Sequence, residues 1–98
     1  MNTILRTRLF DAWLRSLRDR QGQARILARI RSAEAGNFGD CEPVGAGVSE
    51  MRVDWGPGYR VYFIRRALTA YVLLLGGDKS TQRTDIKRAR DMARALKQ

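Results

Sequence analysis

The hydrophobic positions in the first third of this chain follow a helical spacing. A short apolar stretch at 2–7 is compatible with a strand, and beyond it apolar side chains recur every three or four residues. The first group is Phe10, Trp13, Leu14 and Leu17, and the second group is Ile26, Leu27, Ile30 and Ala33. Gly22 marks the break between them, and Gly36 follows the second group. The pattern predicts two helices that form an antiparallel hairpin.

The spacing of apolar positions changes to two in the middle of the chain. Residues 36–47 are rich in Gly, Asn, Asp and Pro, which predicts a loop. Residues 48–55 alternate between apolar and polar side chains, and a Gly-Pro-Gly turn at 56–58 leads into a second alternating segment at 59–64. Residues 70–75 are apolar on both faces, as expected for a central strand. We therefore expect a small antiparallel sheet.

The turn at 56–58 predicts which polar residues face one another. If it pairs the two residues that flank it, Asp54 faces Arg60 and Arg52 faces Tyr62. One face of the hairpin then presents Glu50, Arg52, Asp54, Arg60 and Tyr62. Lys79 follows the central strand and could reach the same face. Such a face suits a phosphate backbone and stacked bases, although an ordinary solvated cross-strand network has the same pattern.

A third helix is predicted after residue 77. Its apolar positions are Ile86, Ala89, Ala93 and Leu96. A row of basic residues, rotated by about 100° from the apolar positions, comprises Arg83, Lys87, Arg90, Arg94 and Lys97. We expect the apolar side to pack on the sheet. The basic row is either a nucleic-acid-binding surface or a solvated helix face.

The composition narrows the possible partners and chemistry. The chain has 19 Lys and Arg against 10 Asp and Glu, a net charge of +9, and both ends are more basic than the middle. This balance favours a polyanionic partner, nucleic acid before an acidic protein or a membrane. There is no histidine and a single cysteine, Cys41. We therefore expect no internal disulfide, no metal site, no cofactor and no histidine-based catalysis.

Length and hydropathy predict one cytoplasmic domain over residues 1–98. The longest apolar run, AYVLLL, is too short to cross a bilayer, and no signal-peptide pattern begins the chain. RNA cleavage without histidine is chemically possible in such a domain. A lysine crowded by arginines can act as a base, arginine stabilises the phosphorane, and tyrosine or a carboxyl group can protonate the leaving oxygen.

Three segments together carry a family resemblance. They are WLRSLRDRQGQARILARIRSAEAGNFGD, EMRVDWGPGYRVYFIRR and LLLGGDKSTQRTDIKRA. The chain resembles the RelE/ParE superfamily of toxins of type II toxin–antitoxin systems, and within it the addiction-module killer proteins near HigB-type toxins. The resemblance implies a microbial-RNase-like α+β fold, with an N-terminal helical hairpin on a small antiparallel sheet and a C-terminal helix.

The resemblance also implies a function and its partners. Most members cut mRNA on the ribosome and so inhibit translation, and an antitoxin, here expected to be of the helix-turn-helix type, silences the toxin. The expected function is therefore a ribosome-dependent mRNA endonuclease. The alternatives are a ParE-like inhibitor of DNA gyrase without nuclease activity, or a non-toxic nucleic-acid-binding module.

Individual residues match the family pattern. Arg60 matches the arginine that binds the scissile phosphate, and Arg52 and Lys79 match supporting basic residues. Glu50 stands where lysine is frequent. The candidates for an acid are Asp85 and Tyr62, because the C-terminal region of the chain lacks the family's usual tyrosine or histidine. We expect RNA contacts from Tyr62, Gln82, Arg83, Lys87, Arg90 and Arg94.

Overall fold

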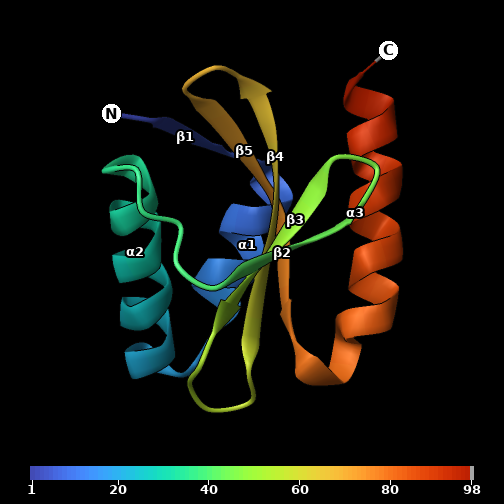
Figure 1. Cartoon of the computed structure of the whole chain (residues 1–98). Helices are drawn as coiled ribbons and strands as arrows, with labels where there is room; N and C mark the ends of the chain where they lie inside the picture. The colour runs from blue at the N-terminus through green and yellow to red at the C-terminus, as the bar shows by residue number, and fades with distance from the viewer. Residues whose placement is uncertain (98) are drawn as a thin grey trace.

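A five-stranded sheet with helices on both faces forms the fold of the computed structural model, which describes residues 1–97 (Figure 1). The elements are β1 (Thr3–Arg6), α1 (Arg8–Ser16), α2 (Arg20–Glu34), β2 (Cys41–Gly45), β3 (Val48–Val53), β4 (Tyr59–Ala67), β5 (Ala70–Asp78), the 3₁₀ turn η1 (Lys79–Thr81) and α3 (Gln82–Leu96). The strand order is β1-β5-β4-β3-β2. The α+β class agrees with the prediction.

The two N-terminal helices begin at side-chain caps. The hydroxyl of Thr7 accepts a hydrogen bond from the N–H of Phe10 at the start of α1, and the carboxylate of Asp19 accepts one from Gly22 at the start of α2. Such caps satisfy backbone donors that the first helical turn leaves free. However, the fold does not begin with this helical pair, because β1 precedes it.

The sheet is mixed rather than purely antiparallel, which corrects the predicted sheet. β1 lies at one edge and pairs in parallel with β5, with Thr3 opposite Ala70 and Arg6 opposite Leu73. The other neighbouring strands are antiparallel. A parallel pair needs a long connection between its strands, and here α1, α2 and the three-stranded β2–β4 meander supply that connection.

The segment predicted as a loop at 36–47 contains the edge strand β2. It pairs antiparallel with β3 across a tight turn in which Ala46 and Gly47 both have positive φ, 55° and 78°. Pro43 is compatible with this strand because an edge strand tolerates a missing backbone donor. Turn-forming residues at both ends of the segment concealed a short strand between them.

The β3–β4 hairpin has a different register from the predicted one. Val53 pairs with Tyr59, so Arg52 lies opposite Arg60 and Glu50 lies opposite Tyr62. The turn is longer than Gly-Pro-Gly because Trp55 leaves the strand, and its indole N–H donates to Asp19 at 3.2 Å. This shift of two residues keeps Glu50, Arg52, Arg60 and Tyr62 on their predicted face but changes their partners. Asp54 does not face Arg60 as predicted, because it lies beyond the end of β3.

Each face of the sheet is covered by a separate apolar cluster. α1 and α2 cover the face that carries Met51, Val61 and Phe63, as expected. On the opposite face, α3 packs through Ala89 and Ala93 (Figure 1). The polar face predicted to be open is thus covered over part of its length. Within residues 1–97, no helix combines the length and the apolar character needed to span a membrane.

Candidate functional site

An open depression lies beside the tip of the β3–β4 hairpin. Its lining residues are Asp40, Arg52, Val53, Asp54, Gly56, Pro57, Gly58, Arg60 and Lys79. They come from the loop before β2, from β3, from the hairpin turn, from β4 and from η1. The fold therefore brings Arg52, Arg60 and Lys79, predicted from separate segments, to one depression. The same surface carries two exposed carboxylates, Asp40 and Asp54.

Lys79 and Arg60 are held together at the hairpin turn. The backbone N–H of Lys79 donates to the carbonyl of Pro57, and Nη1 of Arg60 lies 3.4 Å from the carbonyl oxygen of Gly58. A Cβ at Gly58 would lie 3.4 Å from Cβ of Lys79 and 3.5 Å from Nη1 of Arg60. Gly58 also has φ of +79°, which favours glycine. The glycine therefore leaves room between the two cations.

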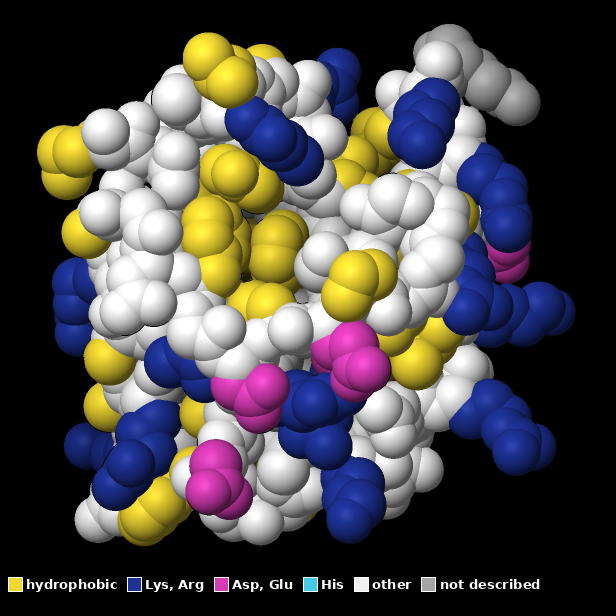
Figure 2. Space-filling model, viewed as in Figure 1, with side chains coloured by type: hydrophobic (Ala, Val, Ile, Leu, Met, Phe, Trp, Pro, Cys, Tyr) yellow, Lys and Arg dark blue, Asp and Glu magenta, His cyan; other side chains and the backbone are white. Residues whose placement is uncertain are grey.

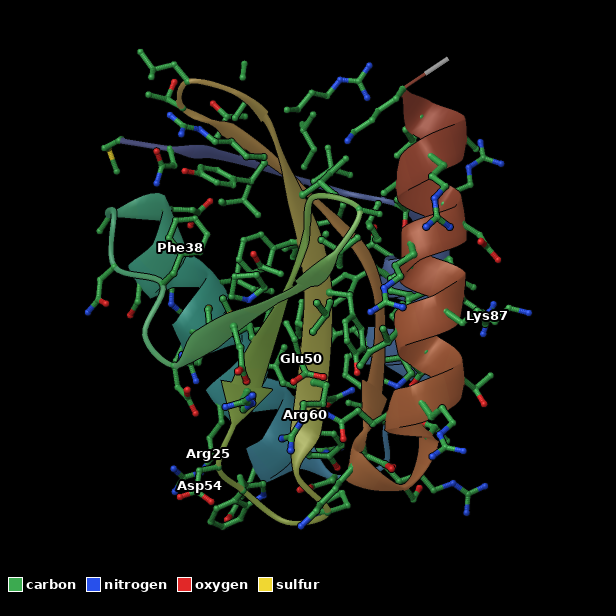
Figure 3. All side chains as sticks on the ribbon, turned by 45° about the vertical axis from the view of Figure 1, so that its right-hand side comes forward. Arg25, Phe38, Glu50, Asp54, Arg60 and Lys87 are labelled. Atoms are coloured by element: carbon green, nitrogen blue, oxygen red, sulfur yellow. The ribbon has the colours of Figure 1, made fainter. Side chains whose placement is uncertain are left out.

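The buried carboxylate of Glu50 is the centre of the polar network above this depression (Figure 3). Glu50 is only 1% exposed. Its Oε2 accepts hydrogen bonds from the hydroxyl of Tyr62 at 3.0 Å and from Nε2 of Gln82 at 2.9 Å. Its Oε1 lies 3.2 Å from Nε of Arg52 and 3.9 Å from Nε of Arg60. One carboxylate thus joins β3, β4 and α3 and faces both arginines.

The two arginines differ in how far their charges are neutralised. Arg52 pairs with Glu50 and Glu42, and its Nη1 lies 3.7 Å from Asp40. The side chain of Arg60 is 13% exposed, and its buried Nε has no hydrogen-bond partner among the described residues. Arg60 therefore carries the less compensated charge. Acidic and basic side chains alternate across the lower middle of this face in Figure 2.

Tyr62 cannot stack on an RNA base in this arrangement, which corrects its predicted role. Its side chain is fully buried against the face that α3 covers. Burial, and then the hydrogen bond to Glu50, raise the pKa of Tyr62 well above its ordinary value. The phenol is therefore a protonated donor that holds Glu50, because the sheet face on which it was correctly placed is not open to solvent.

Asp85 and Gln82 also have structural contacts away from the depression. Asp85 is buried in the first turn of α3, and its Oδ2 accepts a hydrogen bond from the hydroxyl of Thr81 at 2.6 Å. It lies against Gly77, where a Cβ would come within 1.9 Å of Oδ2. Asp85 is not among the residues that line the depression, so it is badly placed to protonate a leaving group there. Gln82 is half-buried and bound to Glu50.

The basic row of α3 follows the predicted spacing. Arg83, Lys87 and Arg94 are exposed, and with Arg90 they border a broad hollow along the helix. Basic side chains project from the α3 edge of the molecule in Figure 2. Arg90 is the exception, because it is half-buried and its Nε donates to the carbonyl of Val44 at 2.5 Å. The sequence identified the row but not the contact that fixes one of its members to β2.

Sequence reasoning missed the roles of three residues around this end of the sheet. Asp40 lines the depression next to Arg52. The Arg29 guanidinium donates to the carbonyls of Arg52 and Phe38, which fastens the loop before β2 to α2. Asp19 binds the side chains of Trp55 and Tyr59. The sequence gives a local indication that Asp19 caps a helix, because it stands three residues before Gly22 at the start of α2. Nothing in the local sequence indicates its contacts with Trp55 and Tyr59.

The fold and this cluster of cations define a small, basic α+β domain with a site suited to an anion. A family model described as phage derived protein Gp49-like (DUF891) matches residues 12–97. A protein of Haemophilus influenzae (strain ATCC 51907 / DSM 11121 / KW20 / Rd), described as uncharacterized, is 47% identical over 90 residues, which are 92% of this chain and 91% of that protein. The chain belongs to the Gp49-like family of phage-derived, toxin-like proteins.

Proposed function

We propose that this protein is a toxin of the RelE/HigB type that binds RNA at the depression beside the β3–β4 hairpin and cleaves mRNA on the ribosome. A cognate antitoxin of the helix-turn-helix type would silence it. One observation carries the proposal: Arg52, Arg60 and Lys79, from two strands and η1, line one open depression. Membership of the toxin-like Gp49-like family supports the same proposal.

The depression suits a phosphodiester for electrostatic reasons. Arginine remains protonated and offers a planar set of donors that matches phosphate oxygens. The Nε of Arg60 makes no hydrogen bond within the described residues, and the side chain is held by the backbone of its own turn, so its position needs little reorganisation when charge develops on a phosphorane. Lys79 is exposed beside it and adds a second cation. We assign phosphate stabilisation to Arg60, with Lys79 and Arg52 in support.

Proton transfer would involve different groups from those first expected. Tyr62 and Asp85 are buried, whereas Asp40 is exposed and lines the depression. Asp40 and Lys79 are therefore our candidates for moving protons to and from the 2′-hydroxyl and the leaving oxygen. The basic row along α3 would bind ribosomal RNA through salt-sensitive phosphate contacts.

A second candidate function is inhibition of DNA gyrase without nuclease activity. The observation in its favour is the burial of Tyr62 and Asp85, which removes two of the expected proton donors from the depression. A ParE-like protein needs no such donor. The two functions predict different cellular effects, because a nuclease cuts translated mRNA and a gyrase poison induces a DNA-damage response.

The test is induced expression in bacteria, followed by mapping of mRNA 5′ ends and measurement of a DNA-damage reporter. We expect growth arrest, new 5′ ends within translated messages, and relief of both by the Arg60→Ala, Lys79→Ala double variant. Co-expression with the neighbouring gene should also relieve arrest if that gene encodes the antitoxin. Growth arrest with a DNA-damage response and intact messages would replace the nuclease proposal by the gyrase proposal.

The double variant needs a matched control. Arg65 and Arg66 are exposed basic residues on the far half of β4, away from the depression, so the Arg65→Ala, Arg66→Ala variant removes the same charge. This control should retain mRNA cleavage. An equal loss of mRNA cleavage in both double variants would show that cleavage depends on the total charge of the protein and not on this site.

A further inference from the structure

A second, smaller pocket lies on the α2 side of the same hairpin. It has a volume of about 260 Å³, and its lining residues are Arg25, Ala28, Arg29, Ser32, Val53 and Asp54. Val53 and Asp54 also line the depression that holds Arg60 and Lys79. The two concavities therefore meet at the end of β3. Figure 3 places Arg25 beside Asp54 near the tip of the β3–β4 hairpin, with Arg60 on the neighbouring strand.

The edge of this pocket is a preformed stack of a guanidinium on an indole. The Cζ atom of exposed Arg25 lies 4.0 Å from the ring centroid of Trp55. Trp55 is itself held in place, because its indole N–H donates to Asp19. Nucleobases stack on arginine planes as well as on aromatic rings. The outer face of the Arg25 guanidinium thus extends the Trp55 stack toward solvent.

The wall behind the stack is also held by hydrogen bonds. Arg29 donates to the carbonyls of Arg52 and Phe38, so it joins α2 to β3 and to the loop before β2. Gly39 has a φ of +67°, and a Cβ there would lie 2.8 Å from Nη2 of Arg29. This part of the pocket is consequently held by hydrogen bonds from a half-buried side chain to the backbone.

We propose that this pocket binds a nucleobase next to the phosphate held at Arg60, with the base stacked on Arg25. The inference rests on the proposed RNA-binding function and adds a base-selective subsite to it. A single-stranded substrate could place its backbone in the depression and turn one base around the end of β3. Stacking accepts any base, so the selectivity comes from the polar group that the end of β3 contributes to the pocket.

That polar group is the carboxylate of Asp54. Asp54 is exposed and makes no ion pair within the described residues, so both of its oxygens can accept hydrogen bonds. The Watson–Crick edge of guanine presents two adjacent N–H donors, which match a carboxylate. Uracil presents one N–H donor between two carbonyl oxygens, which a carboxylate repels. We therefore expect the subsite to prefer guanine to uracil.

The experiment measures equilibrium binding of the purified protein to two short single-stranded RNAs by fluorescence anisotropy. One RNA has a single guanine flanked by uracils, and the other contains only uracil. The wild type should bind the first more tightly. Arg25→Ala should weaken that binding on the order of tenfold, which is the scale of one lost stacking contact, and Asp54→Asn should abolish the preference for guanine.

Two further variants separate stacking from charge. Arg25→Lys keeps the positive charge but loses the plane, so it should weaken guanine binding while leaving the salt dependence unchanged. Arg31→Ala removes an exposed arginine from the same helix, outside the pocket, and should retain the preference. Thermal unfolding of each variant confirms that it is folded at the temperature of the assay.

The outcomes distinguish this inference from the proposed function. If Arg25→Ala and Arg31→Ala have the same small effect, or if the wild type binds both RNAs equally, there is no base subsite. The RNA-binding toxin proposal would then stand unchanged. If the wild type binds neither RNA, the inference is overturned, and the toxin proposal is judged separately by the growth arrest and mRNA cleavage that depend on Arg60 and Lys79.

Discussion

The hydroxyl of Tyr62 donates a 3.0 Å hydrogen bond to Oε2 of Glu50, and both side chains are buried between the sheet and α3. This pair places a buried carboxylate next to two of the cations that line the depression. Since Glu50 also faces Arg52 and Arg60, it positions the residues to which we assign phosphate binding. The following predictions test that arrangement and the elements that support it.

Loss of the Glu50 carboxylate should destabilise the fold far more than loss of Glu42, a surface carboxylate that also pairs with Arg52. Glu50→Ala leaves the buried hydroxyl of Tyr62 and the amide of Gln82 without their acceptor and removes the buried counter-charge of Arg52 and Arg60, so we expect the free energy of unfolding to fall by about 2–4 kcal/mol. Urea denaturation measures this change. The control is Glu42→Ala, which removes the exposed partner of Arg52 and should cost less than about 1 kcal/mol. Similar losses in both variants would contradict the role of Glu50.

Removing a site cation should reduce both the affinity for RNA and its dependence on salt. Each phosphate contact with a single strand contributes about 0.7 to the slope of log K against log salt concentration. We expect Arg60→Ala to bind a short RNA about tenfold more weakly and to lose a slope of about that size, as measured by anisotropy across a salt series. Arg65→Ala is the control, because Arg65 does not line the depression and its guanidinium donates to the carbonyls of Ala67, at the end of β4, and Leu68. An unchanged slope in Arg60→Ala would rule out a direct phosphate contact.

A methyl group at residue 77 should disturb the start of α3. In Gly77→Ala the new Cβ would overlap with Oδ2 of buried Asp85, so the free energy of unfolding should fall by about 1–3 kcal/mol. Thermal or urea unfolding gives the value. In the double variant Gly77→Ala, Asp85→Ala, the free energy of unfolding should fall by less than the sum of the falls in the two single variants, because the clashing carboxylate is gone. Strict additivity would show that the two residues are not in contact.

The carboxylate of Asp19 should make stability depend on pH in the acidic range. Hydrogen bonds from the N–H of Gly22 and the hydroxyl of Tyr59 hold the pKa of Asp19 below its ordinary value of 3.8. Since the pKa is lower in the folded state, ionised Asp19 stabilises the fold above about 3.8, and this contribution is lost as pH falls through the folded pKa.

The variant Asp19→Asn isolates this contribution. It should melt below the wild type at neutral pH, and the difference in Tm should shrink as the pH is lowered through the acidic range. Asp91→Asn removes an exposed carboxylate that pairs with Arg94 along one helix, and it should change Tm little at any pH. A difference for Asp19→Asn that stays constant down to the most acidic measurable pH would argue against the lowered pKa.

The sequence by itself determined the elements and the faces they present. Apolar spacing identified the helices, the β3–β4 hairpin and the central strand, because burial on one side of a helix or strand repeats with the period of the backbone. The same alternation placed Glu50, Arg52, Arg60 and Tyr62 on one sheet face, where the structure also has them. The family resemblance assigned Arg52, Arg60 and Lys79 to one site, and all three line the same depression.

Tertiary structure alone decided which members of that face are accessible and which partners they have. Local sequence does not show that Trp55 would leave the strand to bind Asp19, which lies 36 residues earlier in the chain. This contact accompanies the change in hairpin register. Nor does it show that α3 would cover Tyr62 and Asp85 while leaving Arg60 and Lys79 beside an opening. Burial depends on elements that are distant in the chain, so the same polar alternation could have produced an open face. Packing of α3 buried the part of that face around Glu50 and Tyr62 and left Arg60 and Lys79 at the depression.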